Sequence, residues 1–409
     1  MRFVLAVLLA SVAFADDALL AKPEVKSALD YLHANHDRHS AKQIEICEIP
    51  APTFHEQKRA QFMAAEFRTR RLHDVSIDAQ GNVLGWRKGT SEDVFVIAAH
   101  LDISFEEGVD TKVRREGTRW HAPGIGDDSR GLAAMLALIE ALDAGGIRTR
   151  HTLLFVANVG EEGLGDLIGV KYLFQKSPIR SRLKAFISVD GTNPARVVNG
   201  GNGVKRYRVT FQGPGGHSYG NFGRPNAAHA LGRVVAALAD FQIPTSPKTT
   251  YNVGKIGGGT TVNAITEQAS MEVDLRSESP SELDKLELQF LEAVRTGAAA
   301  ENAKRAASGL QVSAETKLIG NRPAGVTPPN SALVKAALWA SAATGHQPSL
   351  LSASTDANLP ISLGIPAITM GGGGRGDNAH SLREWFDPTD AWKGPQTVLL
   401  TVLAFDSDL

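Results

Sequence analysis

The chain has 409 residues, enough for two domains of ordinary size. Hydrophobic residues make up 43% and charged residues 21%, a balance typical of globular proteins that excludes a disordered or fibrous chain. The formal net charge of -1 provides no global basic field, so we expect no nucleic-acid partner.

An apolar segment follows Arg2 at the start of the chain. The run FVLAVLLASVAF has no polar face and is too short to span a bilayer, and Ala13-Phe14-Ala15 has the small-x-small form of a cleavage site. A buried N-terminal helix is the alternative, and the missing polar face argues against it. We therefore expect residues 1–15 to be a signal peptide, with export to the periplasm or the external medium and no stable membrane anchor.

Three continuously apolar segments predict buried strands. They are VFVIAAHLD (94–102), TLLFVANVG (152–160) and KAFISVD (184–190), and the helix pattern DSRGLAAMLALIEALDAGG lies between the first two. Strand, helix and strand in this order favour an α/β fold with a mostly parallel sheet flanked by helices. Earlier in the chain, Thr53-x-x-Glu56 has the form of a capping box and is expected to begin a helix.

The pattern changes after NGGNG, near residue 200. Segments of alternating polarity and two helical segments follow in the order strand, helix, strand, strand, helix, strand. That order predicts a small ferredoxin-like α+β domain, an antiparallel sheet with helices on one face. We expect residues 203–320 to form this inserted domain and residues 16–202 and 321–409 to form the larger one.

Acidic residues and histidines gather where the predicted strands end and where the predicted helix begins. Because ligands of open α/β sheets bind at the carboxyl ends of the strands, we expect these side chains to converge. Imidazole and carboxylate ligands suit zinc, with manganese or cobalt as substitutes. The residues are His100, Asp102, Asp127, Asp128, Glu161, Glu162, Asp190 and His380.

Each of these residues also has a structural explanation when taken alone. A histidine at a strand end can be a hydrogen-bonded core residue, two aspartates before a helix can be caps, and adjacent glutamates can lie in a solvated loop. Asp102 lies two residues after His100, on the same face of the strand, where it can accept the other ring proton of a metal-bound histidine. Their joint occurrence favours a metal centre.

Motifs along essentially the whole mature chain resemble those of one family. The dinuclear-zinc exopeptidases and deacylases, which include peptidase T, carboxypeptidase G and aminoacylase, carry similar motifs in the same order. The resemblance implies a catalytic domain over 16–202 and 321–409, a lid or dimerisation domain over 203–320, and a homodimer. The motifs are IPAPTFHE, AAHLD, GIGDDSRG, VGEEG, SVDG, GPGGHSYG, TTVNAI, VDLRS, STDAN and AHSLREW.

The resemblance also implies the ligands of two zinc ions. His100, Asp127 and Asp190 would hold one ion, and Asp127, Glu162 and His380 would hold the other, with Asp127 bridging both. An unusual cis peptide bond is expected between Asp127 and its successor.

Catalytic and substrate-binding roles follow from the same resemblance. Glu161 would be the general base for a metal-bridging hydroxide, and Asp102 would support His100. Apart from the resemblance, Glu384 lies four residues after His380 and is expected just outside the ligands. In the inserted domain, the position of His217 matches a histidine that stabilises the oxyanion, and those of Asn263 and Arg276 match contacts to the terminal carboxylate of the substrate. The alternative for His217 is a histidine of an ordinary loop, and the alternative for Arg276 is an ordinary charged residue at a strand end. The residues with roles implied by the resemblance are Glu161, Asp102, His217, Asn263 and Arg276.

The first functional hypothesis is therefore an exopeptidase acting on short peptides, similar to tripeptide aminopeptidases or dipeptidases. Within the resembling family, Asp at the position of Asp190 is typical of the aminopeptidase and dipeptidase branches. The opening IPAPTFHE and the GDDSRG form resemble the peptidase T branch. The second hypothesis is an N-acyl-amino-acid deacylase or a carboxypeptidase with the same chemistry. An inactive binding domain on this fold is the third, and it would be expected to lack a ligand or the base, all of which are present here.

Overall fold

The computed structural model describes residues 18–406, so the predicted signal peptide, 1–15, lies outside the described residues. The described chain falls into two compact units, one made of residues 18–201 and 326–406 and the other of residues 202–325. Among the described helices, none combines the length and the apolar character that a membrane crossing requires.

The first unit is built on a nine-stranded sheet whose central strands are parallel. The strand order is β1-β2-β6-β3-β7-β17-β8-β15, and β16 pairs with β8 outside this path. The pairs β6–β3, β3–β7 and β7–β17 are parallel, whereas β1 and β2 join antiparallel at one side. The predicted mostly parallel α/β sheet is thus confirmed. The strands are β1 (His73–Ile77), β2 (Val83–Arg87), β3 (Val94–His100), β6 (Thr152–Asn158), β7 (Leu183–Val189), β8 (Arg196–Gly201), β15 (Gly325–Val326), β16 (Ser349–Ala353) and β17 (Ala367–Met370).

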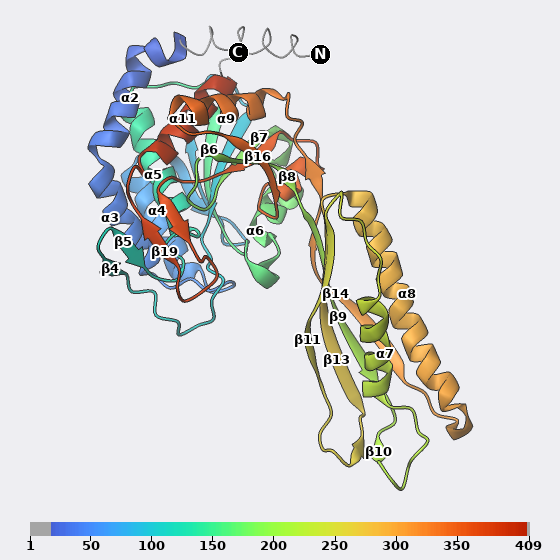
Figure 1. Ribbon diagram of the computed structural model, residues 1–409. Coiled ribbons are helices and arrows are strands. Elements are labelled where there is room, and N and C mark those ends of the chain that lie inside the picture. The colour runs from blue at the N-terminus through green and yellow to red at the C-terminus, as the bar shows by residue number, and fades with distance from the viewer. Residues whose placement is uncertain (1–17, 407–409) are drawn as a thin grey trace. The chain divides into compact units, whose positions relative to one another are not determined.

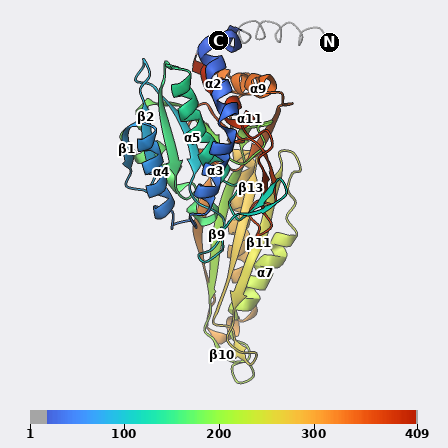
Figure 2. The same ribbon diagram turned by 90° about the vertical axis from the view of Figure 1, so that its left-hand side faces the viewer.

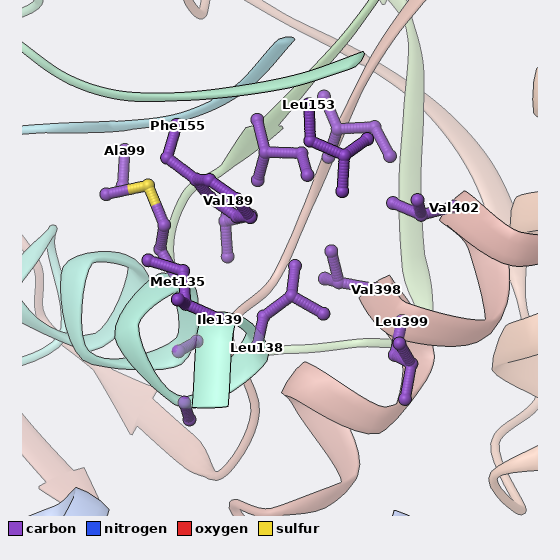
Figure 3. Close-up of a cluster of buried hydrophobic side chains, with 14 of the residues drawn as sticks. Ala99, Met135, Leu138, Ile139, Leu153, Phe155, Val189, Val398, Leu399 and Val402 are labelled. Atoms are coloured by element: carbon purple, nitrogen blue, oxygen red, sulfur yellow. The ribbon is translucent and has the colours of Figure 1, made fainter. Parts of the chain in front are cut away.

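Both faces of this sheet are buried, which explains why its central strands are apolar without alternation. In β3, Phe95 and Ile97 belong to the core cluster on one face, and Val94 and Val96 belong to the cluster on the other. Figure 3 shows the first of these clusters, in which side chains of the strands meet Met135, Leu138 and Ile139 of one helix and Val398, Leu399 and Val402 of another.

Helices flank this sheet, and Figure 1 labels most of them. Figure 2 shows α2 and α3 lying beside α5, and both helices contact α5. The helices of the unit are α2 (Pro23–Ala34), α3 (His36–Cys47), α4 (Gln57–Thr69), α5 (Ser129–Ala144), α6 (Ile168–Lys171), α9 (Ala332–Ala343), α10 (Asn358–Ser362) and α11 (Lys393–Asp406).

A small antiparallel sheet in the same unit joins distant parts of the chain. Its order is β18-β19-β5-β4, so strands near residue 380 pair with strands near residue 120. The segment that carries His380 is thereby fixed beside the segment that leads to Asp127. The strands are β4 (Arg114–Glu116), β5 (Arg119–His121), β18 (Arg375–Asp377) and β19 (Trp385–Asp387).

The second unit is a four-stranded antiparallel sheet with two helices on one face (Figure 1). The strand order is β11-β13-β9-β14, and β10 and β12 form a separate two-stranded pair. Alternate residues of β13, such as Met271, Val273 and Leu275, are buried in a core shared with the helices. The elements are β9 (Gly203–Gln212), β10 (Gly216–His217), α7 (Ala227–Ala239), β11 (Thr249–Gly258), β12 (Ala264–Ile265), β13 (Gln268–Ser277), α8 (Pro280–Lys304) and β14 (Ser313–Arg322).

Candidate metal centre

Three neighbouring parallel strands, β6, β3 and β7, present predicted ligands at their carboxyl ends. His100 is the last residue of β3. Glu161 and Glu162 follow β6, and Asp190 follows β7. Because the strands are adjacent and parallel, these residues meet at one edge of the sheet, as expected.

The carboxylate of Asp127 lies between two histidines that are far apart in the sequence. Its Oδ1 is 3.0 Å from Nε2 of His100, and its Oδ2 is 3.1 Å from Nε2 of His380. The same Nε2 of His380 lies 2.8 Å from Oε1 of Glu162. A carboxylate with one oxygen directed to each of two imidazoles has the arrangement needed in a ligand shared by two ions.

The ligand atoms form three overlapping groups, and within each group they lie within 4.8 Å of one another. The group of Asp127, Glu162 and His380 is the set predicted for one zinc ion. In a second group, Asp128 accompanies His100 and Asp190, where the resemblance implies Asp127. The third group contains His100, Glu161 and Glu162. The groups are His100–Glu161–Glu162, His100–Asp128–Asp190 and Asp127–Glu162–His380.

The contacts of Asp128 explain this difference. Its Oδ2 accepts a hydrogen bond from the backbone N–H of His100 at 3.1 Å, and its Oδ1 accepts one from Gly131 N–H at 3.0 Å and so caps α5. Both oxygens of Asp128 therefore accept hydrogen bonds from backbone N–H groups, whereas both oxygens of Asp127 face imidazole nitrogens. The peptide bond between the two aspartates is cis, so that prediction is confirmed.

Gly131 allows the start of α5 to lie directly against β7. A Cβ atom at this position would be 2.0 Å from the carbonyl oxygen of Val189 and 2.3 Å from Oδ1 of Asp128. Any larger residue would push the helix away from the strand. The glycine thus lets the residues before the helix approach the strand end from which Asp190 extends.

Asp102 has a different main contact from the one predicted. The Nδ1 atom of His100 lies 3.0 Å from the backbone oxygen of Asp102 and 3.5 Å from its carboxylate. The carboxylate instead accepts hydrogen bonds from the N–H groups of Glu161 and Glu162, each at 2.9 Å. Asp102 therefore orients the imidazole mainly through its carbonyl and holds the acidic pair through its side chain.

Thr53 and Glu56 were expected to form a capping box, and that prediction is wrong. Helix α4 begins at Gln57, and its first residues receive no side-chain cap bond from Glu56. Thr53 Oγ1 donates to Oδ2 of Asp102 at 2.8 Å, and Oε1 of Glu56 accepts from Gly160 N–H at 3.0 Å. Both residues support the site, and their partners are too distant in sequence for local spacing to reveal them.

Burial and neighbouring negative charge together raise the pKa values of carboxyl groups in the centre. Burial and the neighbouring Asp127 raise the pKa of Asp190 to about 7, and burial raises the pKa of Asp128 well above its ordinary value. Carboxyl groups respond in this way when too little positive charge is near them. Divalent cations would supply that charge, and the nitrogen and oxygen donors fit zinc.

The two histidines respond in the opposite direction. Burial alone would lower the pKa of His100, but the nearby carboxylates of Asp102 and Asp127 raise it well above its ordinary value. Hydrogen bonds with Asp127 and Glu162 raise the pKa of His380 to about 11. Both shifts show that the surrounding carboxylates strongly favour a positive charge at the imidazole positions.

The three predicted residues of the second unit are only partly brought together. His217 and Asn263 are neighbours, because β10 pairs with β12 and Ser218 N–H donates to the Asn263 carbonyl at 2.9 Å. Arg276 lies near the C-terminal end of β13. By the rise per residue of a strand it is about 26 Å from Gln268, the first residue of β13. Its guanidinium donates to both carboxylate oxygens of Asp274, at 2.6 and 3.2 Å.

The ring of His217 has a defined hydrogen-bonding state. The backbone N–H groups of Tyr219 and Gly220 both donate to its Nδ1, each at 3.2 Å. An accepting Nδ1 places the proton of the neutral ring on Nε2. The exposed histidine therefore offers Nε2–H as a hydrogen-bond donor.

Comparison with known proteins gives one family and distant relatives. The model of a family described as Peptidase family M20/M25/M40 matches residues 96–404. The uncharacterized protein YqjE of Bacillus subtilis is 25% identical over 353 residues, which cover 82% of this chain and 90% of that protein. Carboxypeptidase G2 of a Pseudomonas species is 22% identical over 219 residues, 51% of each chain.

Solved structures share the fold at low sequence identity. The aminopeptidase PepT of Bacillus cereus matches with a TM-score of 0.72 at 19% sequence identity. A tripeptidase of Staphylococcus aureus matches with a TM-score of 0.74 at 19% sequence identity. Each match covers 91% of this chain and 99% of the other chain. YxeP of Bacillus subtilis, described as a dinuclear metal binding peptidase, matches with a TM-score of 0.67 at 17% sequence identity. The match covers 92% of this chain and 100% of the YxeP chain. Together these likenesses establish the fold.

Proposed function

Because the chain belongs to peptidase family M20/M25/M40 and is a hydrolase of peptide bonds, we propose that it is a zinc-dependent exopeptidase that cleaves short peptides. The observation that carries the proposal is the carboxylate of Asp127, which directs one oxygen to His100 and the other to His380. The family includes dinuclear metal-binding peptidases, and this carboxylate has the position of a bridging ligand.

The residues present fit two metal ions. We propose that His100, Asp127 and Asp190 hold one ion and that Asp127, Glu162 and His380 hold the other. The second set is gathered within 4.8 Å. The raised pKa of Asp190 reflects burial first and the neighbouring Asp127 second, and cations would balance the negative charge of the buried carboxylates. Zinc suits these donors, and manganese or cobalt could replace it.

The protein's own groups then have distinct tasks. When bound, the two ions would lower the pKa of a water molecule and polarise the scissile carbonyl. Glu161 would take the proton from the attacking water and pass it to the leaving amine nitrogen. The carboxylate of Asp102 accepts hydrogen bonds from the N–H groups of Glu161 and Glu162 and so would fix the positions of the base and of one ligand relative to each other.

Residues of the second unit would act on the substrate. We propose that His217 stabilises the oxyanion through Nε2–H, and the hydrogen bonds to its Nδ1 support this donor role. Asn263 and Arg276 would bind the terminal carboxylate of the peptide. Arg276 would do so as a guanidinium that is already oriented by Asp274.

Short unblocked peptides are the proposed substrates. Support comes from the aminopeptidase and the tripeptidase whose structures share this fold. The similarity to carboxypeptidase G2 favours the alternative, removal of a C-terminal residue or an acyl group by the same chemistry.

Substrate profiling separates these functions. Purified, zinc-loaded protein is assayed on free tripeptides and dipeptides, on the same peptides with a blocked N-terminus, and on N-acyl amino acids. We expect cleavage of the free peptides, with at least tenfold lower kcat/KM on the blocked ones. Turnover of only the blocked substrates would establish the alternative, and the absence of turnover on every substrate with two ions bound would favour a binding domain.

Export and a homodimer remain proposals from the sequence and the family resemblance. N-terminal sequencing of protein recovered outside the cytoplasm would show whether processing occurs near Asp16. Light scattering on that protein would give its oligomeric state.

A further inference from the structure

The carboxylate of Glu384 binds the backbone of the loop that leads to Asp127. Its Oε2 accepts a hydrogen bond from Gly124 N–H at 2.7 Å. Its Oε1 accepts bonds from Gly126 N–H at 2.8 Å and from Asp127 N–H at 3.1 Å. Glu384 is 1% exposed, so solvent cannot readily replace these three bonds.

Glu384 belongs to the same short loop as His380. The loop joins β18 to β19, and successive turns link Ser381 N–H to the Asn378 carbonyl and Glu384 N–H to the Ser381 carbonyl. His380 has a φ of 63°, a left-handed conformation that a non-glycine residue keeps only when its surroundings impose it. The anchored carboxylate of Glu384 supplies such a constraint four residues away.

One side chain therefore connects the backbones that carry two candidate ligands of the same ion. Asp127 is the residue whose N–H donates to Oε1, and His380 lies on the loop that provides this oxygen. Loss of the connection would allow the two ligands to move apart by small amounts. Groups that orient metal ligands typically change metal affinity by about 10- to 100-fold when they are removed.

We propose that Glu384 is a positioning residue that fixes the separation of Asp127 and His380 and thereby sets the affinity for the ion that they share. The proposal rests on the metal centre proposed above. It adds that this affinity depends on a residue that contacts neither the ions nor the substrate.

The test uses Glu384→Gln in the full chain. Glutamine has nearly the same shape, but its amide NH2 cannot accept a hydrogen bond, so at least one of the three N–H donors loses its acceptor. Metal-free protein is titrated with Co²⁺ while the visible absorption of the bound ion is recorded. We expect two binding steps in the unchanged protein and an affinity about 10- to 100-fold lower for one of them in the variant.

His380→Ala identifies the affected step. His380→Ala should abolish the step that Glu384→Gln weakens. Adding Glu384→Gln to His380→Ala should leave the remaining step unchanged, because only one ion lies between Asp127 and His380, the two ligands whose separation Glu384 is proposed to fix. If His380→Ala still binds two cobalt ions as tightly as the unchanged protein, the proposed metal centre is wrong and the role of Glu384 fails with it. If His380→Ala loses a step but Glu384→Gln keeps both at full affinity, only the role of Glu384 is wrong.

Glu301→Gln is the matched control for a purely structural effect. Glu301 is fully buried in the second unit, where it accepts bonds from Asn226 N–H at 3.2 Å and from Arg233. Its replacement should lower the thermal midpoint without altering either cobalt step. Equal weakening of both ions by Glu384→Gln would also contradict the proposal. Should circular dichroism show that this variant is unfolded, Glu384→Asp, which is too short to span the three donors, is judged by the same criteria.

Discussion

Asp102 shows how one side chain can organise several functional groups. Its carboxylate accepts hydrogen bonds from Thr53 and from the N–H groups of both Glu161 and Glu162, while its carbonyl lies against His100. The proposed base and two proposed ligands are thus held by a residue that is 0% exposed. Rigid support of this kind keeps a catalytic group within the small tolerance that chemistry requires.

Glu161 is the proposed general base. Replacing it with Gln removes the proton acceptor but no proposed ligand, so kcat should fall by about 100- to 10,000-fold while two ions stay bound. Measurement of kcat and of metal content by atomic emission checks both parts.

Glu162→Gln is the matched comparison for that prediction. It alters a proposed ligand at the neighbouring position and should lose metal together with activity. Loss of an ion from Glu161→Gln would show that this carboxylate is itself a ligand, as its group with His100 and Glu162 allows. A near-normal kcat would show that another group is the base.

Some residues of the candidate site can be predicted from the sequence, and others cannot. The ligand types at strand ends could be named because strand polarity and chemistry are both local properties. Thr53 and Glu56 were misread because a local pattern, the capping box, offered a sufficient explanation. Their actual partners, Asp102 and Gly160, lie 49 and 104 residues further along the chain.

At the scale of elements, Glu140 joins four helices. Its carboxylate accepts from Tyr31 of α2 at 3.1 Å, from Arg38 and His39 of α3 at 2.5 and 2.9 Å, and from Arg70 at the end of α4 at 2.7 Å. Glu140 itself belongs to α5. Burial would raise its pKa, but the hydrogen bonds with His39 and Arg38 lower it below the ordinary 4.5.

The lowered pKa predicts how stability depends on pH. A carboxyl group with a lower pKa in the folded state contributes stability above its unfolded pKa of about 4.5 and loses it as the pH falls below that value. Glu140→Gln should therefore reduce the free energy of unfolding of the first unit by about 2 kcal/mol at pH 7. The difference from the unchanged protein should shrink below pH 4.5. Urea unfolding across this pH range measures it.

Glu292→Gln provides the control for this pH effect. Glu292 pairs with Arg295 within the exposed surface of α8, where solvent screens the pair, so its loss should leave the unfolding midpoint unchanged. A Glu140 variant whose deficit is the same at pH 3 and pH 7 would contradict the assigned charge effect.

For the whole molecule, each unit has its own hydrophobic core. The core cluster of the second unit draws only on residues between 207 and 312, and the candidate metal ligands all belong to the first unit. Because metal binds the folded state, it should stabilise only the unit that contains the ligands, by about 2.7 kcal/mol at 100 times the dissociation constant.

Calorimetry can detect this division. We expect two unfolding transitions, of which chelation of the metal shifts only one to lower temperature, by several degrees. The same scans on His380→Ala should show a smaller metal-dependent shift in that transition. Equal shifts of both transitions on chelation would contradict the independence of the two cores.

The amino-acid sequence is sufficient to predict the fold class, the order of elements in the inserted region and the chemistry of the candidate ligands. These properties depend on short stretches of sequence, namely runs of apolar residues, alternating polarity along strands and the residue types at strand ends. The tertiary structure alone decided that Asp127 faces two histidines, that Asp128 serves the backbone, and that Glu384 joins two loops more than 250 residues apart. Such contacts depend on which strand ends and loops the folded sheet brings together, and no local pattern encodes that convergence.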